Sequence, residues 1–145
     1  MKETVLIIDD DEAILRSLKR LLISNYSVVC YSDPYAAIEY AKQNALDLVI
    51  CDLLMPSLSG LAVLEKIKAV KPYSSRMLLT GYAEMEASKH AVKDKVATMI
   101  TAKPWDNFEL SMLVEILIEN SKLRQLHCLE HSSRHVCYCS KHQRN

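Results

Sequence analysis

The sequence lacks several features that would each define a class of protein. Eighteen basic and eighteen acidic residues cancel over 145 positions, so no excess charge favours a nucleic acid or an anionic membrane as partner. No apolar run approaches the roughly 18 residues that a membrane span needs, and the first residues, MKETVLIIDDD, lack the layout of a signal peptide. Low-complexity linkers and internal repeats are absent. We therefore expect one soluble, cytoplasmic domain without membrane or direct nucleic-acid contact.

The cysteines do not form the pattern of a small disulfide-rich fold. Two of the five, Cys30 and Cys51, stand in apolar runs, where a buried thiol is expected. Cys128, Cys137 and Cys139 fall near the end, among four of the five histidines, but Cys137 and Cys139 lack the usual two-residue spacing of a zinc site. We predict a globular domain over residues 1–122. Residues 123–145 are expected to be a helix extension and a disordered tail, the remnant of a truncation or of cloning.

Short apolar runs alternate with segments of helical spacing. The runs predict five strands, over residues 5–8, 27–31, 46–51, 76–80 and 97–100. A helical pattern follows each run, and the last extends from about residue 106 to about residue 126. Strands that alternate with helices form βαβ units, which predicts an α/β fold with a doubly wound, five-stranded parallel sheet and five helices. In such sheets ligands bind beyond the carboxyl ends of the strands.

Polar side chains stand where the predicted strands end, and the fold would bring them to one edge of the sheet. They are Asp9, Asp10 and Asp11 after the first strand, Asp52 after the third, Thr80 at the end of the fourth and Lys103 after the fifth. Taken singly, helix capping or a loop position explains each aspartate. A satisfied hydroxyl explains Thr80, and a solvated charge explains Lys103. Taken together, however, these residues indicate a shared functional site, which none of them indicates alone.

Three neighbouring carboxylates call for a cation, because two like charges about 4 Å apart repel by about 4 kcal/mol at an effective dielectric constant of about 20. Carboxylate oxygens, a backbone carbonyl and waters are the ligands that Mg²⁺ prefers. The Thr80 hydroxyl and the Lys103 ammonium would serve an anion beside the metal. This combination suits phosphoryl transfer to an aspartate that acts as the nucleophile.

Both glycines of the chain lie close to this predicted edge. Gly60 follows Asp52 in the next loop, and Gly81 directly follows Thr80. Gly60 could simply begin a helix after a turn. Gly81 could relieve a turn, or it could leave room for a bulky group to approach.

Four motifs in order carry a resemblance to a known family: VLIIDDDEAIL, LVICDLLMPSLSG, MLLTGYA and ITAKPW. Together they resemble the receiver domain of two-component response regulators, over Met1 to about Asn120. The resemblance implies a flavodoxin-like sheet of strand order 2-1-3-4-5. It also implies a bacterial phosphoprotein of signal transduction, a switch that turns over no external substrate and so is not an enzyme.

The resemblance also implies a role for each site residue. Asp52 would accept a phosphoryl group from a histidine kinase, a phosphotransfer protein or a small phosphodonor. Thr80 would donate a hydrogen bond to the phosphoryl group, Lys103 would pair with it, and the peptide bond between Lys103 and Pro104 is expected to be cis. Mg²⁺ would be held by Asp10 directly, by Asp9 largely through water, by Asp52, and by the backbone carbonyl of Leu54 as the third protein ligand.

Phosphorylation is implied to alter a partner surface. That surface combines the fourth strand, the fourth helix, the fifth strand and the fifth helix, and it would serve an output domain, an effector or a second copy of the chain. Two positions depart from the family pattern. Ser59 stands where an aspartate is familiar, a change that we do not expect to affect the chemistry, and Ile100 replaces an aromatic residue whose inward rotation reports the state of the threonine. Tyr82 could cover the site instead.

Two alternative functions remain. Ile100 keeps open a pseudo-receiver, an interaction module that works without phosphorylation. A phosphohydrolase of the haloacid dehalogenase type would also use an aspartate nucleophile on a similar sheet. That chemistry needs a second aspartate two residues later as general acid, and this chain has Leu54 there. The receiver is the interpretation that accounts for all the site residues.

Overall fold

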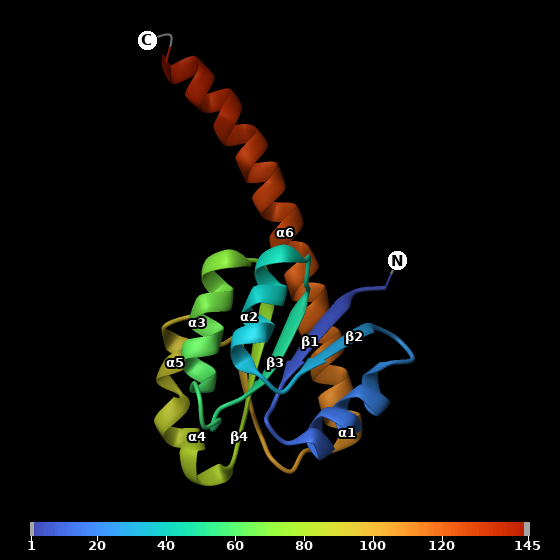
Figure 1. The fold of residues 1–145 in the computed structure, drawn as a ribbon. Helices are drawn as coiled ribbons and strands as arrows, with labels where there is room; N and C mark the ends of the chain where they lie inside the picture. Colours follow the sequence, from blue (N-terminus) through green and yellow to red (C-terminus); the bar gives the residue numbers. More distant parts are fainter. Residues whose placement is uncertain (1, 144–145) are drawn as a thin grey trace.

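The computed structural model describes the backbone of residues 2–143 and the side chains of residues 2–127 and of Leu129. Within that part, five strands form one parallel sheet in the order β2-β1-β3-β4-β5 (Figure 1). The strands are β1 (Thr4–Ile8), β2 (Ser27–Tyr31), β3 (Leu48–Asp52), β4 (Ser75–Thr80) and β5 (Met99–Ala102). The predicted fold class and strand order are confirmed.

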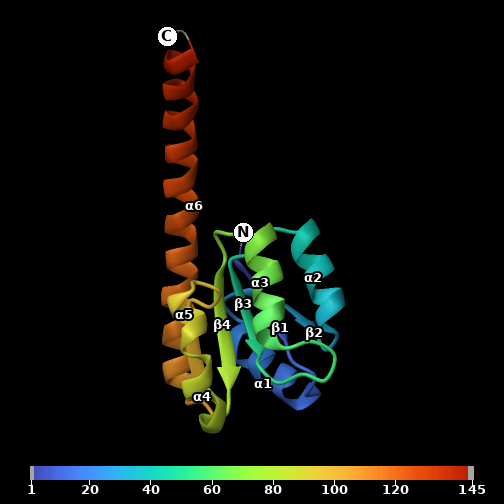
Figure 2. The same ribbon diagram turned by 90° about the vertical axis from the view of Figure 1, so that its left-hand side faces the viewer.

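Helices connect the strands and cover both faces of the sheet (Figure 2). They are α1 (Glu12–Leu22), α2 (Pro34–Gln43), α3 (Gly60–Val70), α4 (Tyr82–Ser88), α5 (His90–Lys93) and α6 (Asn107–Gln143). Four of them begin at a side-chain cap: Asp11 accepts from the Ala13 amide, Asp33 from the Tyr35 amide, Ser59 from the Ala62 amide and Asp106 from the Glu109 amide. Each such cap stabilises a helix by about 1 kcal/mol.

The core has two layers because successive side chains of a strand point to opposite faces. Leu6 and Ile8 of β1 pack with α2 and α3, whereas Val5 and Ile7 pack with α1 and α6. All four side chains have an exposed fraction of 0%. Complete burial of one such side chain contributes roughly 1.5–3 kcal/mol, so both faces of the central strands stabilise the sheet.

Several elements differ in their bounds from the sequence-based expectation; β3, for example, begins at Leu48 and not at residue 46. β5 begins two residues later than predicted, because the Ala97 amide donates to the Ala91 carbonyl and so ends the preceding turn. The helical segment predicted between the fourth and fifth strands is divided into α4 and α5. Here the Ser88 hydroxyl donates to the Glu84 carbonyl at 2.9 Å, a back-bond that competes with the regular helix.

The last helix, α6, packs on the sheet and then projects from the body of the domain (Figures 1 and 2). Leu110, Val114 and Leu117 are buried, whereas Leu123 and Leu126 are more than half exposed. The predicted boundary between the domain and its C-terminal extension falls between residues 122 and 123, where the helix is continuous. That boundary therefore stays a prediction. The side chains of Cys128, Cys137 and Cys139 lie outside the described residues. Within the described part, none of the helices has the length and apolar character to cross a bilayer.

Candidate functional site

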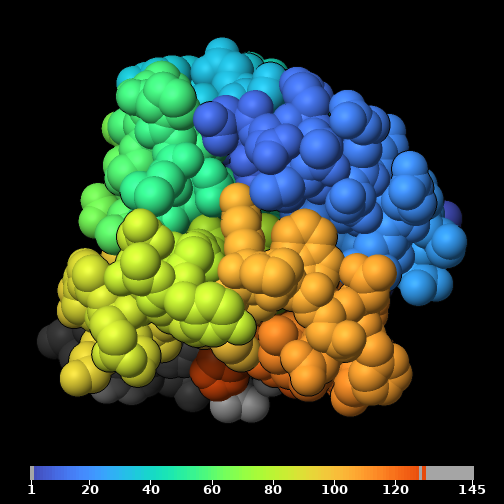
Figure 3. Space-filling model, turned by 90° about the horizontal axis from the view of Figure 1, so that it is seen from below, coloured from blue at the N-terminus to red at the C-terminus, as the bar shows by residue number. Residues whose placement is uncertain are grey.

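The carboxyl ends of the strands meet at the lower edge of the sheet in Figure 1, and Figure 3 looks directly at this edge. Four segments converge there: the turn from β1 to α1, the loop after β3, the start of α4, and the segment after β5. Parallel pairing aligns them, because Ile8 of β1 lies beside Cys51 of β3, and Asp52 lies beside Leu79 of β4. The edge therefore collects residues that are far apart in the sequence.

Three aspartates form a cluster at this edge. One carboxylate oxygen each from Asp9, Asp10 and Asp52 lies within 4.8 Å of the others. Asp9 and Asp52 are buried, with exposed fractions of 1% and 7%, whereas Asp10 is exposed. Asp9 Oδ1 accepts the Asp11 amide at 2.9 Å, and the Asp11 side chain caps α1 instead of joining the cluster. The cluster is thus held in place by the turn and open to solvent on one side.

Lys103 connects two of these carboxylates. Its Nζ lies 2.7 Å from Asp52 Oδ1 and 3.0 Å from Asp9 Oδ2. The Lys103 amide donates to the Thr80 carbonyl at 2.8 Å, and the peptide bond to Pro104 is cis, as the family resemblance implies. The lysine therefore reaches the acids from the end of β5, although it follows Asp9 by 94 residues.

The pKa values of two groups in this cluster, Asp9 and Lys103, are shifted from their usual ranges. Removal from water raises the pKa of the Asp9 carboxyl above its usual range, although the Asp11 amide and Lys103 oppose the shift. Burial lowers the pKa of Lys103, but its hydrogen bonds to Asp52 and Asp9 outweigh that effect and the pKa is raised. Lys103 is therefore a cation at neutral pH. One ammonium faces three carboxyl groups, so the cluster still attracts positive charge.

Thr80 and Leu54 border the cluster without bonding to it. Thr80 is 2% exposed, and its hydroxyl donates to the Gly81 carbonyl at 3.4 Å, the long limit of a hydrogen bond. None of the hydrogen bonds between described side chains joins Thr80 to the aspartates. The Leu54 and Tyr82 side chains are 61% and 73% exposed, so neither is packed over the cluster. Ile100 is partly buried and packs against the core layer that contains Leu6 and Ile8.

The two glycines differ in how closely other atoms approach them. A Cβ on Gly60 would lie 2.2 Å from the Asp52 backbone oxygen and 2.9 Å from Leu53 Cα. A Cβ on Gly81 would have only the flexible Glu84 carboxylate nearby, at 3.1 Å. Gly60 therefore allows the loop to fold back against Asp52, a close approach that the sequence did not indicate. The Gly60 amide donates to the Leu53 carbonyl at 2.8 Å and closes the loop.

We expect Gly60→Ala to lower the free energy of unfolding by about 2–4 kcal/mol, because the new Cβ must displace backbone atoms next to Asp52. The matched control, Gly81→Ala, meets only a movable side chain and should cost less than about 1 kcal/mol. Urea denaturation of both variants measures the difference. Equal losses of stability in the two variants would show that the close approach of backbone atoms to Gly60 does not determine the cost.

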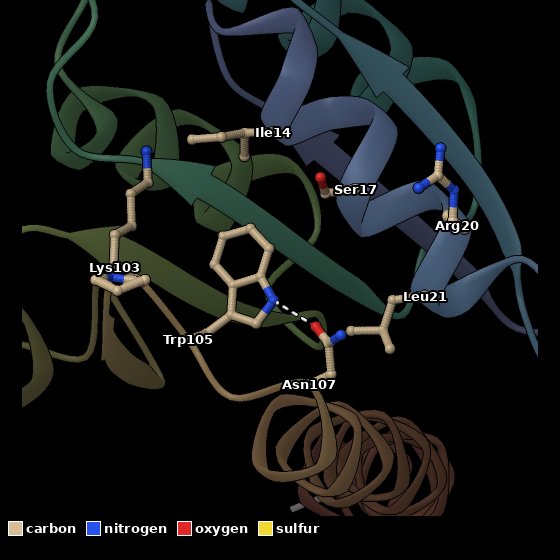
Figure 4. A pocket seen from close by; sticks show the side chains of 8 residues that line it. Ile14, Ser17, Arg20, Leu21, Lys103, Trp105 and Asn107 are labelled. Carbon is tan, nitrogen blue, oxygen red and sulfur yellow. Dashed lines mark hydrogen bonds between the residues drawn. The ribbon is translucent and has the colours of Figure 1, made fainter.

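A groove that was not predicted from the sequence opens beside Lys103 (Figure 4). Its volume is about 780 Å³, and it lies between α1 and the segment that leads from β5 into α6. Ile14 and Leu21 of α1 face Trp105, whose indole Nε1 donates to Asn107 Oδ1 at 3.0 Å. The walls are largely apolar, and Arg20 supplies a charge at one end. The groove is therefore a largely apolar surface next to the acid cluster.

Comparisons with known proteins agree with this geometry. The sequence model of the protein family described as the response regulator receiver domain matches residues 5–115. The chain is 29% identical over 110 residues to the transcriptional regulatory protein ZraR of Escherichia coli (strain K12), covering 74% of this chain and 25% of that protein. It is 27% identical over 124 residues to the alkaline phosphatase synthesis transcriptional regulatory protein PhoP of Bacillus subtilis (strain 168), covering 85% of this chain and 51% of that protein.

A solved structure extends the agreement to three dimensions. A response regulator receiver domain protein from Clostridium thermocellum aligns with a TM-score of 0.77 and 31% identity, covering 83% of this chain and 98% of that chain. The chain spans a quarter to a half of the length of the two regulators, so the match concerns one part of each. The protein belongs to the response regulator receiver domain family of two-component systems.

Proposed function

We propose that the domain accepts a phosphoryl group on Asp52 from a histidine kinase or phosphotransfer protein, with Mg²⁺ as cofactor. The observation that carries the proposal is the setting of Asp52. It is buried at the carboxyl edge, 2.7 Å from Lys103 Nζ and clustered with Asp9 and Asp10. A carboxylate held in this way is suited to act as a nucleophile, with Lys103 beside it and with the other aspartates placed to hold a cation.

The donor set fits Mg²⁺. All the side-chain donors are carboxylate oxygens, three of them lie within 4.8 Å of one another, and the exposed Asp10 leaves room for water ligands. Asp9, Asp10, Asp52 and the Leu54 carbonyl would hold the ion. When bound, it would supply positive charge to offset the phosphoryl oxygens.

The residues of the chain supply the remaining chemistry. An Asp52 carboxylate oxygen forms a bond to phosphorus while the bond from phosphorus to the donor breaks. The electron pair of that bond stays with the donor, which takes up a proton. Lys103 uses two of its three N–H donors on Asp52 and Asp9, so the third is available for a phosphoryl oxygen. Thr80 loses little when its hydroxyl turns from the Gly81 carbonyl to the phosphoryl group.

Phosphorylation would be transmitted through α4, α5, β5 and α6. Ser88 is the one buried residue of α4 and Ala91 the one of α5, so little packing holds these helices and they are suited to move. We propose that this surface acts on an output domain, an effector or a second copy of the chain. The groove beside Trp105 would receive the phosphodonor protein.

The test is incubation of the protein with a small phosphodonor and Mg²⁺, followed by intact mass measurement. We expect the mass of one phosphoryl group to be added with Mg²⁺ and not with EDTA. A chain that gains no mass and shows no spectral response to beryllofluoride would instead be a pseudo-receiver. Continuous release of phosphate at a high rate would favour the phosphohydrolase.

Mg²⁺ should stabilise the protein through the acid cluster. By mass action, a concentration tenfold above the dissociation constant raises the free energy of unfolding by about 1.4 kcal/mol. Asp9→Asn should abolish this gain, while Asp11→Asn should retain it, since Asn also caps helices and Asp11 lies outside the cluster. Thermal unfolding with and without Mg²⁺ measures the gain. A gain preserved in Asp9→Asn would place the ion elsewhere.

The same variant tests the pKa of Asp9. Because burial raises that pKa, the contribution of Asp9 to the stability of the metal-free protein is fully present below its ordinary value of 3.8 and is lost as the pH rises through the folded pKa. In EDTA, Asp9→Asn should therefore gain stability relative to the wild type as the pH rises from below 3.8 towards neutral. A difference that does not change with pH would contradict the shift.

A further inference from the structure

A strongly basic pocket lies at the opposite edge of the sheet from the acid cluster. It has a volume of about 370 Å³ and is bordered by α3, the start of β4, the turn before β5, and α6. Four of its lining residues are cations, Lys68, Arg76, Lys95 and Arg124, and none is acidic. The whole chain has no net charge, so this concentration of positive charge is a local feature.

Arg76 is the buried centre of the pocket. Its exposed fraction is 6%, and its side-chain hydrogen bonds go to neutral oxygens. Nε donates to the Val96 carbonyl at 2.8 Å, Nη1 to the Ser74 carbonyl at 2.6 Å and Nη2 to the Lys95 carbonyl at 3.1 Å. Burial, together with the charge of Arg124, lowers the pKa of Arg76 to about 10. The guanidinium is still charged at neutral pH, and a buried charge without a counter-ion is destabilising.

The other three cations leave that charge uncompensated. Arg124 reaches in from α6, where Nη2 donates to Ser75 Oγ at 2.6 Å. Lys95 has a φ of 63°, a conformation that is uncommon for residues other than glycine and that is held by its hydrogen bonds to Val92 and Arg76. Among the ion pairs between described side chains, none includes any of the four cations.

We propose that this pocket binds a small anion with a diphosphate group. Guanidinium groups match phosphate oxygens in geometry, and the two lysines add point charges at the rim. The volume lies in the range of ligand pockets, roughly 300–1,000 Å³, and exceeds what a single inorganic phosphate would fill. Free pyrophosphate and a nucleoside diphosphate share this chemistry.

Such a ligand would tie α6 to the body of the domain. Arg124 belongs to α6, next to the exposed Leu123, whereas Arg76 belongs to β4 and Lys95 to the turn before β5. Arg76 and Arg124 repel each other, since both are cations. An anion that contacts Arg76, Lys95 and Arg124 would attract all three. The pocket is thus a ligand site that acts on the helix extension independently of Asp52.

Isothermal titration of the full chain in EDTA, with pyrophosphate and separately with ADP, tests the proposal. We expect saturable one-to-one binding that Arg124→Gln and Lys95→Gln each weaken by about tenfold, as expected when one charged hydrogen-bond donor is lost. Lys42→Gln, on α2 and away from the pocket, is the control and should bind as the wild type does. Binding of ADP as well as pyrophosphate would identify a nucleotide site, and binding of pyrophosphate alone a site for the free anion.

Two results would overturn the proposal. One is the absence of saturable binding up to about 10 mM of either probe, a concentration far above that of a specific site. The other is equal weakening by Lys42→Gln and Lys95→Gln, which would indicate general attraction to a charged surface. Lys95 is exposed, so its substitution keeps the test valid even if Arg124→Gln impairs folding.

Discussion

Asp52→Asn should reduce phosphoryl uptake from a small phosphodonor to background, a loss of at least about 10³-fold as expected when a nucleophile is removed. The amide oxygen that replaces the carboxylate is a poor nucleophile, and among the described side chains no other carboxylate has the same setting. Asp9 accepts the Asp11 amide and Lys103, and Asp10 is exposed. Intact mass spectrometry after incubation with phosphodonor and Mg²⁺ measures the uptake.

The control for this variant is Asp33→Asn. Asp33 also lies beyond the carboxyl end of a strand and caps the following helix, but it is not part of the acid cluster. Its substitution should leave uptake unchanged. A phosphoryl group that still appears in Asp52→Asn, at a rate near that of the wild type, would contradict the role of Asp52.

The sequence was sufficient to predict the cluster, because the parallel register brings strand ends together. Asp9 and Asp52 end neighbouring strands, and Lys103 follows the outer strand on the same edge. Hydrophobic runs identify the strands, and the family motifs identify their order. Each of these signals is local, and the topology converts it into a three-dimensional arrangement. The meeting of three carboxylates and a lysine was therefore predictable without coordinates.

Features that depend on contacts between distant segments were not predictable. The crowding of Gly60 against the Asp52 carbonyl depends on how the loop folds back. The division between α4 and α5 depends on a hydroxyl that bonds within the helix, and Ser88 in the sequence does not reveal which acceptor it uses. The basic pocket combines residues from four separate segments, so no window of the sequence contains it.

Lys103→Gln should lower the free energy of unfolding, and the size of the effect should depend on metal. In EDTA, the substitution leaves the buried Asp9 and Asp52 carboxylates without their cation. Breaking a buried ion pair costs about 3–5 kcal/mol, and we expect about 2–3 kcal/mol here because the Lys103 side chain is 22% exposed. The control Lys42→Gln removes an exposed pair with Glu39 and should change stability by less than about 0.5 kcal/mol.

Mg²⁺ should reverse much of this loss, because a divalent ion at the cluster supplies the charge that Lys103 no longer provides. The stabilisation by saturating Mg²⁺ should therefore be larger in Lys103→Gln than in the wild type, although phosphoryl uptake falls by about 10²–10³-fold without the ammonium. Denaturant titrations with and without Mg²⁺ measure the first effect, and mass spectrometry the second. Equal stabilisation by Mg²⁺ in both proteins would mean that Lys103 and the metal do not compensate the same carboxylates. A greater gain joined to slower uptake would separate the two roles of the lysine, as a counter-charge in the resting domain and as a partner of the phosphoryl group.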